Sequence, residues 1–222
     1  MLQTTPTPVS SWPDELSTLP VAITEKINQL PAVIERAVDA AISTRPLPTI
    51  VGRWIDDIAA ENLPEARYVL HPNRVAACVE NLFASRGLTA TPALTWLAED
   101  AGKLARCVCR IAGTDRVRLR IEAVDDNACS RLHIDHVVAR MICTYRGPGT
   151  QLGLEASDPS EIQTVPTGMP VLLKGKLWPS QPAPKLRHRS PPIDGTDITR
   201  LILVLEGTSP EDFMPANEKL YA

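Results

Sequence analysis

The chain has 222 residues, of which 44% are hydrophobic and 22% charged, a composition that predicts one well-buried domain, or one domain with a helical extension, and excludes a disordered chain. Its formal net charge of −3 argues against a general nucleic-acid or anionic-membrane binder, because affinity for phosphate groups needs clustered Lys and Arg. The sequence shows no long apolar run and no charged-then-apolar leader, so we expect a soluble, cytoplasmic protein.

The N-terminal half predicts a tail followed by helices. Residues 1–16 are rich in Thr, Pro and Ser, which predicts a mobile tail. Apolar residues then recur at helical spacing, with Pro or Thr near the starts and Gly near the stops. The predicted helices cover residues 21–30, 32–43, 49–58, 73–87 and 93–112. Each has one apolar stripe to bury, so we expect residues 17–113 to form a helical layer on one face of a sheet.

The five cysteines are Cys78, Cys107, Cys109, Cys129 and Cys143. Their number is odd and their spacing is not that of a disulfide framework, so we expect no permanent bridge. Cys107 and Cys109 form a C-x-C pair, but on a helix their side chains would leave separate faces. We therefore do not expect this pair to bind a metal.

The hydrophobic period changes at Asp115. Three apolar residues then alternate with Arg116, Arg118 and Arg120, which predicts a half-buried strand with one basic face. This arginine face is either a patch for an acidic substrate or partner, or a solvated face of a sheet. The segments that follow are short, strand-like and separated by turn residues. We expect residues 114–208 to close into a jelly-roll or cupin-like barrel, and residues 209–222 to form a C-terminal tail.

The stretch from residue 129 to 151, CSRLHIDHVVARMICTYRGPGTQ, holds a His-x-Asp pair. On an extended strand His133 and Asp135 project from the same face and offer one nitrogen and one oxygen ligand. A third ligand must come from a distant strand, and among the four histidines His188 is the candidate, in the strand-like segment KLRHRS. Two histidines and one carboxylate with open positions are typical of non-haem Fe(II) oxygenases.

Several neighbours of the pair also receive predictions. Tyr145 has the parity of His133 and Asp135, so we expect it to face the same interior. His136 has the opposite parity and is predicted to lie at the surface or behind the ligands. Trp178 lies in a proline-dense segment, which predicts a stiff loop at the mouth of the barrel where the indole could cover a site.

Arg200 is the charged residue inside the segment ITRLILVLE, whose two faces are otherwise apolar up to Glu206 at its end. A buried arginine needs an anionic partner, because an unpaired buried charge is costly. A planar guanidinium suits a carboxylate bound through two parallel hydrogen bonds. The partner is either a co-substrate or an internal acid such as Glu155 or Glu161.

The order of these motifs resembles the prolyl-hydroxylase-like branch of the 2-oxoglutarate/Fe(II) oxygenases, over roughly residues 129–206. More narrowly, the words RLHIDHVVARMICTYRGPGT, LLKG and HRSPP are similar to an uncharacterised bacterial domain-of-unknown-function family, number 1826, which would span most of the chain. The oxygenase resemblance implies an α+β fold, with a double-stranded β-helix and an N-terminal helical layer. It implies that His133, Asp135 and His188 bind Fe(II) and perform the catalysis.

The same resemblance assigns the co-substrate. Arg200 matches the basic residue that binds the distal carboxylate of 2-oxoglutarate, and Tyr145 matches a tyrosine that helps to hold it. Where that branch usually has two adjacent glycines before an acidic residue or threonine, this chain reads Gly147-Pro148-Gly149-Thr150-Gln151, and its gap from His188 to Arg200 is slightly long.

Three functions remain open from the sequence. The first is an Fe(II)/2-oxoglutarate oxygenase acting on a small molecule or a protein. The second is a cupin-like protein that binds a divalent metal, such as zinc, with Cys129 or Cys143 adding a thiolate that zinc favours. The third is an inactive scaffold that binds a partner through the arginine face. No residue pattern names the substrate or the oligomeric state.

Overall fold

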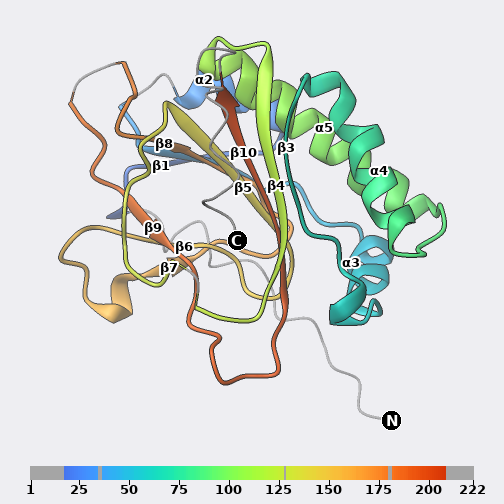
Figure 1. Cartoon of the computed structure of the whole chain (residues 1–222). Helices are drawn as coiled ribbons and strands as arrows, with labels where there is room; N and C mark the ends of the chain where they lie inside the picture. The colour runs from blue at the N-terminus through green and yellow to red at the C-terminus, as the bar shows by residue number, and fades with distance from the viewer. Residues whose placement is uncertain (1–17, 35–36, 128, 180–181, 209–222) are drawn as a thin grey trace, which may run out of the picture.

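The computed structural model describes residues 18–34, 37–127, 129–179 and 182–208 (Figure 1). The two predicted tails, 1–16 and 209–222, lie outside these residues. In the part that is described, no helix is long and apolar enough to cross a membrane.

A seven-stranded sheet forms the centre of the fold, in the order β1-β2-β8-β5-β10-β4-β3. All neighbouring strands are antiparallel except β1 and β2, which are parallel. The strands are β1 (Val21–Thr24), β2 (Ala40–Ser43), β3 (Ala66–Leu70), β4 (Arg116–Val124), β5 (Ala139–Arg146), β8 (Val171–Lys174) and β10 (Arg200–Thr208).

A smaller antiparallel sheet has the order β7-β6-β9. Its strands are β6 (Gln151–Gly153), β7 (Gln163–Thr164) and β9 (Arg187–Arg189). His133 extends this sheet by an isolated antiparallel bridge to His188 of β9. The two sheets bring together segments that are far apart in the sequence, and this is how the predicted ligands meet.

The helices lie on the face of the large sheet that is turned away from the small sheet (Figure 1). They are α2 (Leu30–Ile34), α3 (Thr49–Asp56), α4 (Val75–Ser85) and α5 (Pro92–Ala112), with short 3₁₀ turns η2 (Ile27–Gln29), η3 (Ala60–Asn62), η4 (Pro72–Arg74) and η5 (Pro159–Glu161). The longest, α5, begins where the Thr91 hydroxyl accepts a hydrogen bond from the Leu94 N–H. It ends at Gly113, whose φ of 67° is the left-handed conformation that glycine adopts without strain.

Two hydrophobic cores share the strands of the large sheet. Alternate residues of β10 take opposite sides: Leu201, Leu203 and Leu205 pack against the helices, while Ile202 and Val204 face the small sheet. This alternation was expected from the sequence and is confirmed. The same holds for β4, where the apolar positions are buried and Arg116 and Arg118 are exposed.

The prediction of helices at residues 21–30 and 32–43 is wrong for much of each segment. Val21–Thr24 and Ala40–Ser43 are strands that pair with each other, and β2 also pairs with β8. The segment Ala66–Leu70, for which no strand was predicted, pairs with β4 at the opposite edge. Short apolar runs fit a buried strand as well as a buried helix, and the pairing partner decides between them. The N-terminal region therefore contributes strands to the sheet as well as helices.

Candidate metal centre

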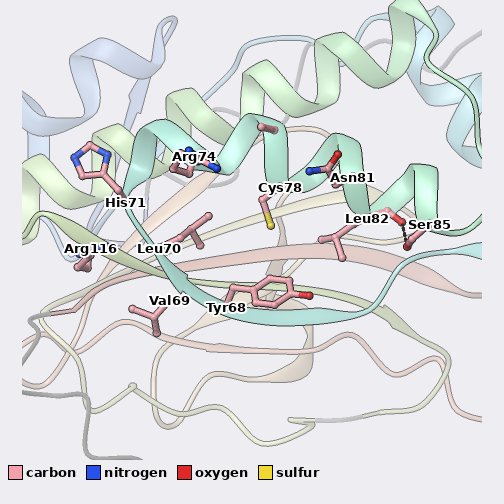
Figure 2. Close-up of a pocket in the computed structure, with 11 residues that line it drawn as sticks. Tyr68, Val69, Leu70, His71, Arg74, Cys78, Asn81, Leu82, Ser85 and Arg116 are labelled. Atoms are coloured by element: carbon pink, nitrogen blue, oxygen red, sulfur yellow. Dashed lines mark hydrogen bonds between the residues drawn. The ribbon is translucent and has the colours of Figure 1, made fainter.

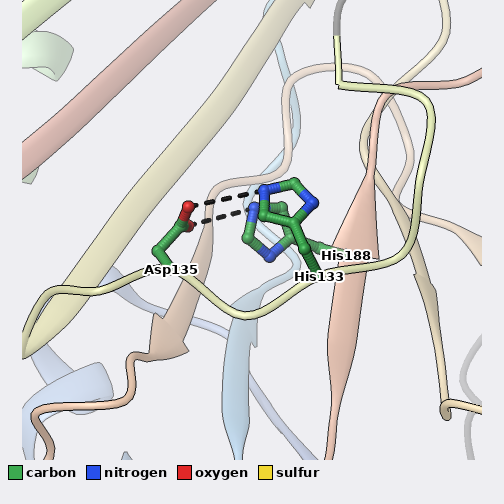
Figure 3. A group of neighbouring side chains, drawn as sticks. All are labelled: His133, Asp135 and His188. Carbon is green, nitrogen blue, oxygen red and sulfur yellow. Dashed lines mark ion pairs between the residues drawn. The ribbon is translucent and has the colours of Figure 1, made fainter.

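The His-x-Asp segment lies beside β9 because the backbones of His133 and His188 bind each other. The N–H of His133 donates to the His188 carbonyl, and the N–H of His188 donates to the His133 carbonyl, each at 3.0 Å. This reciprocal pair fixes the two histidines opposite each other although they are far apart in sequence. Figure 3 shows the side chains of His133, Asp135 and His188 turned toward one another.

The three side chains converge on one point. The Nε2 atom of His188 lies 3.1 Å from Asp135 Oδ2, and Nε2 of His133 lies 3.4 Å from Asp135 Oδ1. One ligand atom from each residue fits within 4.8 Å of the others, and the structure's described part holds no other such group of three. The prediction that these residues come together is confirmed, and we call them the metal group.

Two contacts orient the metal group. Nδ1 of His133 lies 2.8 Å from the Arg131 carbonyl oxygen, so this nitrogen carries the proton and Nε2 keeps its lone pair free for a metal. The Asp135 carbonyl accepts a hydrogen bond of 2.8 Å from the Lys176 N–H. Backbone contacts thus hold both ends of the His-x-Asp segment.

Gly175 is the residue that lets the chain after β8 approach this segment. A Cβ atom at this position would lie 2.0 Å from the Val137 carbonyl oxygen, closer than any side chain tolerates. Leu177 and Gly175 also donate backbone hydrogen bonds to Val137 and Val138. The glycine of the LLKG word is therefore required by close backbone packing next to Asp135.

The protonation states suit metal binding. Burial lowers the pKa of His188 more than the attraction of Asp135 raises it, which favours the neutral imidazole that ligates metals. Burial alone would raise the pKa of Asp135, but the hydrogen bond from His188 and the charge of Arg140 outweigh it and hold the pKa below its usual value. Neutral imidazoles and carboxylates are donors that Fe(II) accepts.

Arg140, which the sequence did not single out, contacts the metal group directly. Its Nη1 lies 2.6 Å from Asp135 Oδ1, and its Nη2 is paired with Glu206 Oε1. Glu206 is paired in turn with Arg118, at 3.1 Å. The alternation of side chains along β5 places Arg140 on the face of the large sheet that looks toward the small sheet. Its contact with Glu206 could be predicted only by knowing that β5 and β10 are neighbouring strands.

Arg200 is buried with 1% of its surface exposed, as the sequence predicted. Its Nε donates to the Pro148 carbonyl at 2.7 Å and its Nη2 approaches the Thr144 hydroxyl at 3.4 Å, whereas Nη1 has no hydrogen-bond partner. Burial lowers its pKa to about 10, so it stays charged at neutral pH.

Neither proposed internal acid reaches Arg200. Glu155 pairs with Arg187, and the carboxylate of Glu161 accepts from the N–H of Asp158 at the start of η5. No salt bridge to Arg200 occurs among the described residues. A buried, charged guanidinium with an unused N–H group can bind an anionic ligand strongly.

Tyr145 does not face the metal group, which corrects the parity prediction. Its hydroxyl donates to Asp100 Oδ2 at 2.6 Å, and the ring is buried in the core beneath the helices. Parity fails because the chain crosses from the small sheet at His133 to the large sheet at Ala139. Trp178 is also wrong as a cover for the site, since its ring packs in the same helix-side core.

The cysteines stand apart from the metal group. Cys129 is exposed and is not one of its members, and Cys143 is buried on the helix side of the sheet. All five cysteines are free, as expected. The thiols of Cys107 and Cys109 approach the backbone carbonyl oxygens of Ile27 and Arg116, respectively. His136 is exposed, as predicted.

A groove of about 550 Å³ lies elsewhere, between β3 and α4 (Figure 2). Leu70 and Leu82 contribute apolar lining, Tyr68 is half exposed, and His71 and Arg116 also line it. None of the predicted ligands or co-substrate residues lines this groove, so it is separate from the metal group.

The chain resembles known proteins both in its fold and in its sequence. The solved structure of dioxygenase for auxin oxidation 1 from Arabidopsis thaliana, a binary complex with 2-oxoglutarate, is 12% identical and gives a TM-score of 0.50, with 89% of this chain and 98% of that chain covered. The dioxygenase for auxin oxidation of rice is 13% identical, with a TM-score of 0.46 and coverages of 87% and 84%. The first similarity shows a related fold and no more, and the second is too weak for an argument.

No curated protein matches the sequence. The model of a family described as "Protein of unknown function (DUF1826)" matches residues 24–206, which is most of the chain and includes all three residues of the metal group together with Arg200 and Arg140. The chain therefore belongs to the DUF1826 family.

Proposed function

We propose that this chain is an Fe(II)- and 2-oxoglutarate-dependent oxygenase. The main support is a pair of sites on the two sheets: two histidines of the small sheet converge with Asp135, and β10 of the large sheet carries a buried arginine with an unpaired Nη1. Arg140, beside Asp135, and Thr144, beside Arg200, point to the same side of β5. With a metal at the three ligands, 2-oxoglutarate would offer its keto acid end to the metal and its distal carboxylate to Arg200.

We infer that the barrel is a double-stranded β-helix. From β4 onward the chain passes between the sheets in the order β4, His133, β5, β6, β7, β8, β9 and β10, with only β6 and β7 consecutive in one sheet. This supports a jelly roll, in which paired antiparallel strands alternate between two facing sheets. The Arabidopsis neighbour, a 2-oxoglutarate-binding oxygenase by its description, supports the same fold.

The residues would divide the work as follows. His133, Asp135 and His188 would hold Fe(II) on one side, and Arg200 would bind the distal carboxylate of 2-oxoglutarate. Thr144, buried beside Arg200, offers a hydroxyl to the same carboxylate. When bound, the metal and co-substrate would supply the oxidative chemistry, which protein side chains cannot perform. The apolar residues Ile142, Ile202 and Val204 lie between the two ends and would exclude water from the co-substrate.

The metal group contains no thiolate, which disfavours the alternative of a zinc site completed by Cys129 or Cys143. Cys143 is on the wrong side of the sheet and Cys129 is outside the metal group. Structural zinc sites are usually completed by cysteine, whereas two histidines and one carboxylate leave positions open for a co-substrate.

The test is an anaerobic titration of metal-free protein with Fe(II) and then 2-oxoglutarate, following the visible charge-transfer band of the chelate. Arg200→Met should keep Fe(II) binding and weaken 2-oxoglutarate binding about 30-fold or more, because one partner of a buried charge pair is lost. The matched control is Arg120→Met on β4, the strand beside β10, which removes an arginine that pairs with Glu122 of the same strand. Fe(II) binding without the band in wild type would contradict the use of 2-oxoglutarate.

A further inference from the structure

Arg140 lies at the start of β5 between two acidic side chains. One end of its guanidinium contacts Asp135 Oδ1 at 2.6 Å, and the other pairs with Glu206. All three side chains are largely buried, with 18% of Arg140, 11% of Asp135 and 9% of Glu206 exposed. Charge-assisted contacts of this kind are strong where water is excluded, so they fix the orientation of the groups that they join.

Glu206 is itself held from both sides. In the sheet register it stands opposite Arg140 of β5 and opposite Arg118 of β4, so one carboxylate is shared by arginines of both neighbouring strands. Arg118 binds Oε2 of Glu206, while Arg140 binds Oε1. Glu206 therefore cannot turn away without losing both contacts, and it keeps the Arg140 guanidinium pointed at Asp135.

This arrangement makes the two oxygens of Asp135 unequal. Oδ1 is bound by Arg140 at 2.6 Å and lies 3.4 Å from His133 Nε2, whereas Oδ2 lies 3.1 Å from His188 Nε2 and makes no other hydrogen bond. A carboxylate that bound a metal through both oxygens would take a position that a co-substrate or dioxygen needs. We infer that Arg140 is a positioning residue that restricts Asp135 to one metal bond, through Oδ2, and that Glu206 and Arg118 hold Arg140 in place.

The inference rests on the metal site of the proposed function but not on its co-substrate. The probe is Co(II), whose visible absorption changes with coordination number, titrated into metal-free protein without 2-oxoglutarate. Arg140→Met should weaken Co(II) binding about 10- to 100-fold, the usual cost of losing a residue that orients a ligand. It should also change the Co(II) spectrum, because Asp135 becomes free to bind through both oxygens. A role confined to stability would leave the spectrum unchanged.

Two conservative variants separate positioning from folding. Arg140→Lys keeps the charge and should restore part of the affinity. Glu206→Gln keeps the size of the side chain and should shift affinity and spectrum in the same direction as Arg140→Met, but less. Both remain informative if Arg140→Met does not fold. Arg120→Met, an arginine on the same sheet face without contact to Asp135, should bind Co(II) as wild type does.

The outcomes are distinct. If wild type binds Co(II) and the Arg140 variants match it in affinity and spectrum, the inference is overturned while the proposed function stands. The titration with Fe(II) and 2-oxoglutarate gives the affinity of the same variants for the co-substrate. If only that affinity is lost, Arg140 is a co-substrate ligand and the inference is also overturned. If wild type binds neither Co(II) nor Fe(II), the proposed function fails and the inference fails with it.

Discussion

Strand β5 separates two charged clusters that differ in composition and in exposure to solvent. Between α5 and the sheet lie Arg45, Asp100 and Tyr145, which we call the helix-side cluster. Asp100 Oδ2 accepts from the Tyr145 hydroxyl and from Arg45, and the Arg45 guanidinium lies 5.0 Å from the centre of the Trp96 ring. On the other side, the metal group brings together two histidines and the carboxylate of Asp135.

The difference indicates which cluster is built for structure and which for a ligand. The helix-side cluster contains its own acid and base, and although Nε and Nη1 of Arg45 lack hydrogen bonds, Trp96 covers the guanidinium. Burial raises the pKa of Asp100 despite Arg45, whereas the pKa of Asp135 lies below its usual value. His133 keeps 33% of its side chain exposed, so the metal group is open to solvent. The first cluster fastens α5 to the sheet, and the second is open to the metal that we propose it binds.

The largest expected effect comes from breaking the helix-side cluster. Asp100→Asn leaves Arg45 buried without its counter-charge, which should cost about 3 to 5 kcal/mol in the free energy of unfolding. Denaturant titration measures this loss. Metal affinity of the folded variant should equal that of wild type, since the cluster is on the other face of the sheet. The control is Glu99→Gln, an exposed neighbour on α5 whose pairing with Lys103 should be worth less than about 0.5 kcal/mol.

Loading the metal group tests the other side of the comparison. A divalent metal at a free concentration of about 100 times its Kd should raise the free energy of unfolding by about 2.7 kcal/mol, because it binds only the folded state. The gain should disappear on chelation and should be absent in His188→Ala. Thermal unfolding with and without metal measures it. An equal gain in wild type and His188→Ala would place the metal elsewhere.

Some residues of the site could be predicted from the sequence and others could not. His133, Asp135, His188 and Arg200 could be predicted because their chemistry is unusual for strand-like segments. Tyr145 could not be placed, since its parity with Asp135 ends where the chain changes sheets between them. Arg140 and Glu206 were hidden for a related reason: their pairing depends on the neighbour relation of β5 and β10, which single-strand patterns do not contain.

The N-terminal strands show the same limit at the level of the fold. The apolar run at Ala40–Ser43 is buried on both faces, so it carries neither helical nor alternating periodicity, and β8 determines its state by pairing with it. By contrast α5, whose apolar stripe is sustained and whose ends carry a Thr cap and a terminal glycine, was predicted almost to the residue.

A smaller change separates the two roles that Tyr145 has been given. Tyr145→Phe removes the hydrogen bond to Asp100 and should cost about 1.5 kcal/mol, the low end for a bond to a charged group, because Arg45 still pairs with the carboxylate. Denaturant titration checks the loss. Affinity for 2-oxoglutarate should not change, as measured by the same charge-transfer titration. A loss of co-substrate affinity without a loss of stability would return Tyr145 to the role that the sequence suggested.

The smallest expected effect is a pH dependence that arises at His188 of the metal group. The pKa of His188 is lowered from 6.5 chiefly by burial, so below pH 6.5 the unfolded chain takes up a proton that the folded chain does not. The free energy of unfolding of metal-free protein should therefore fall as the pH drops from 6.5 toward the folded pKa, and this contribution should be flat above 6.5. His188→Gln lacks the titrating group, so its stability should fall less over the same interval. Denaturant titrations of both proteins at several pH values between about 5 and 8 measure the difference. An equal dependence of the free energy of unfolding on pH in the two proteins would mean that the fold does not hold His188 in its neutral form. The metal-free site would then lack the protonation state that metal binding requires.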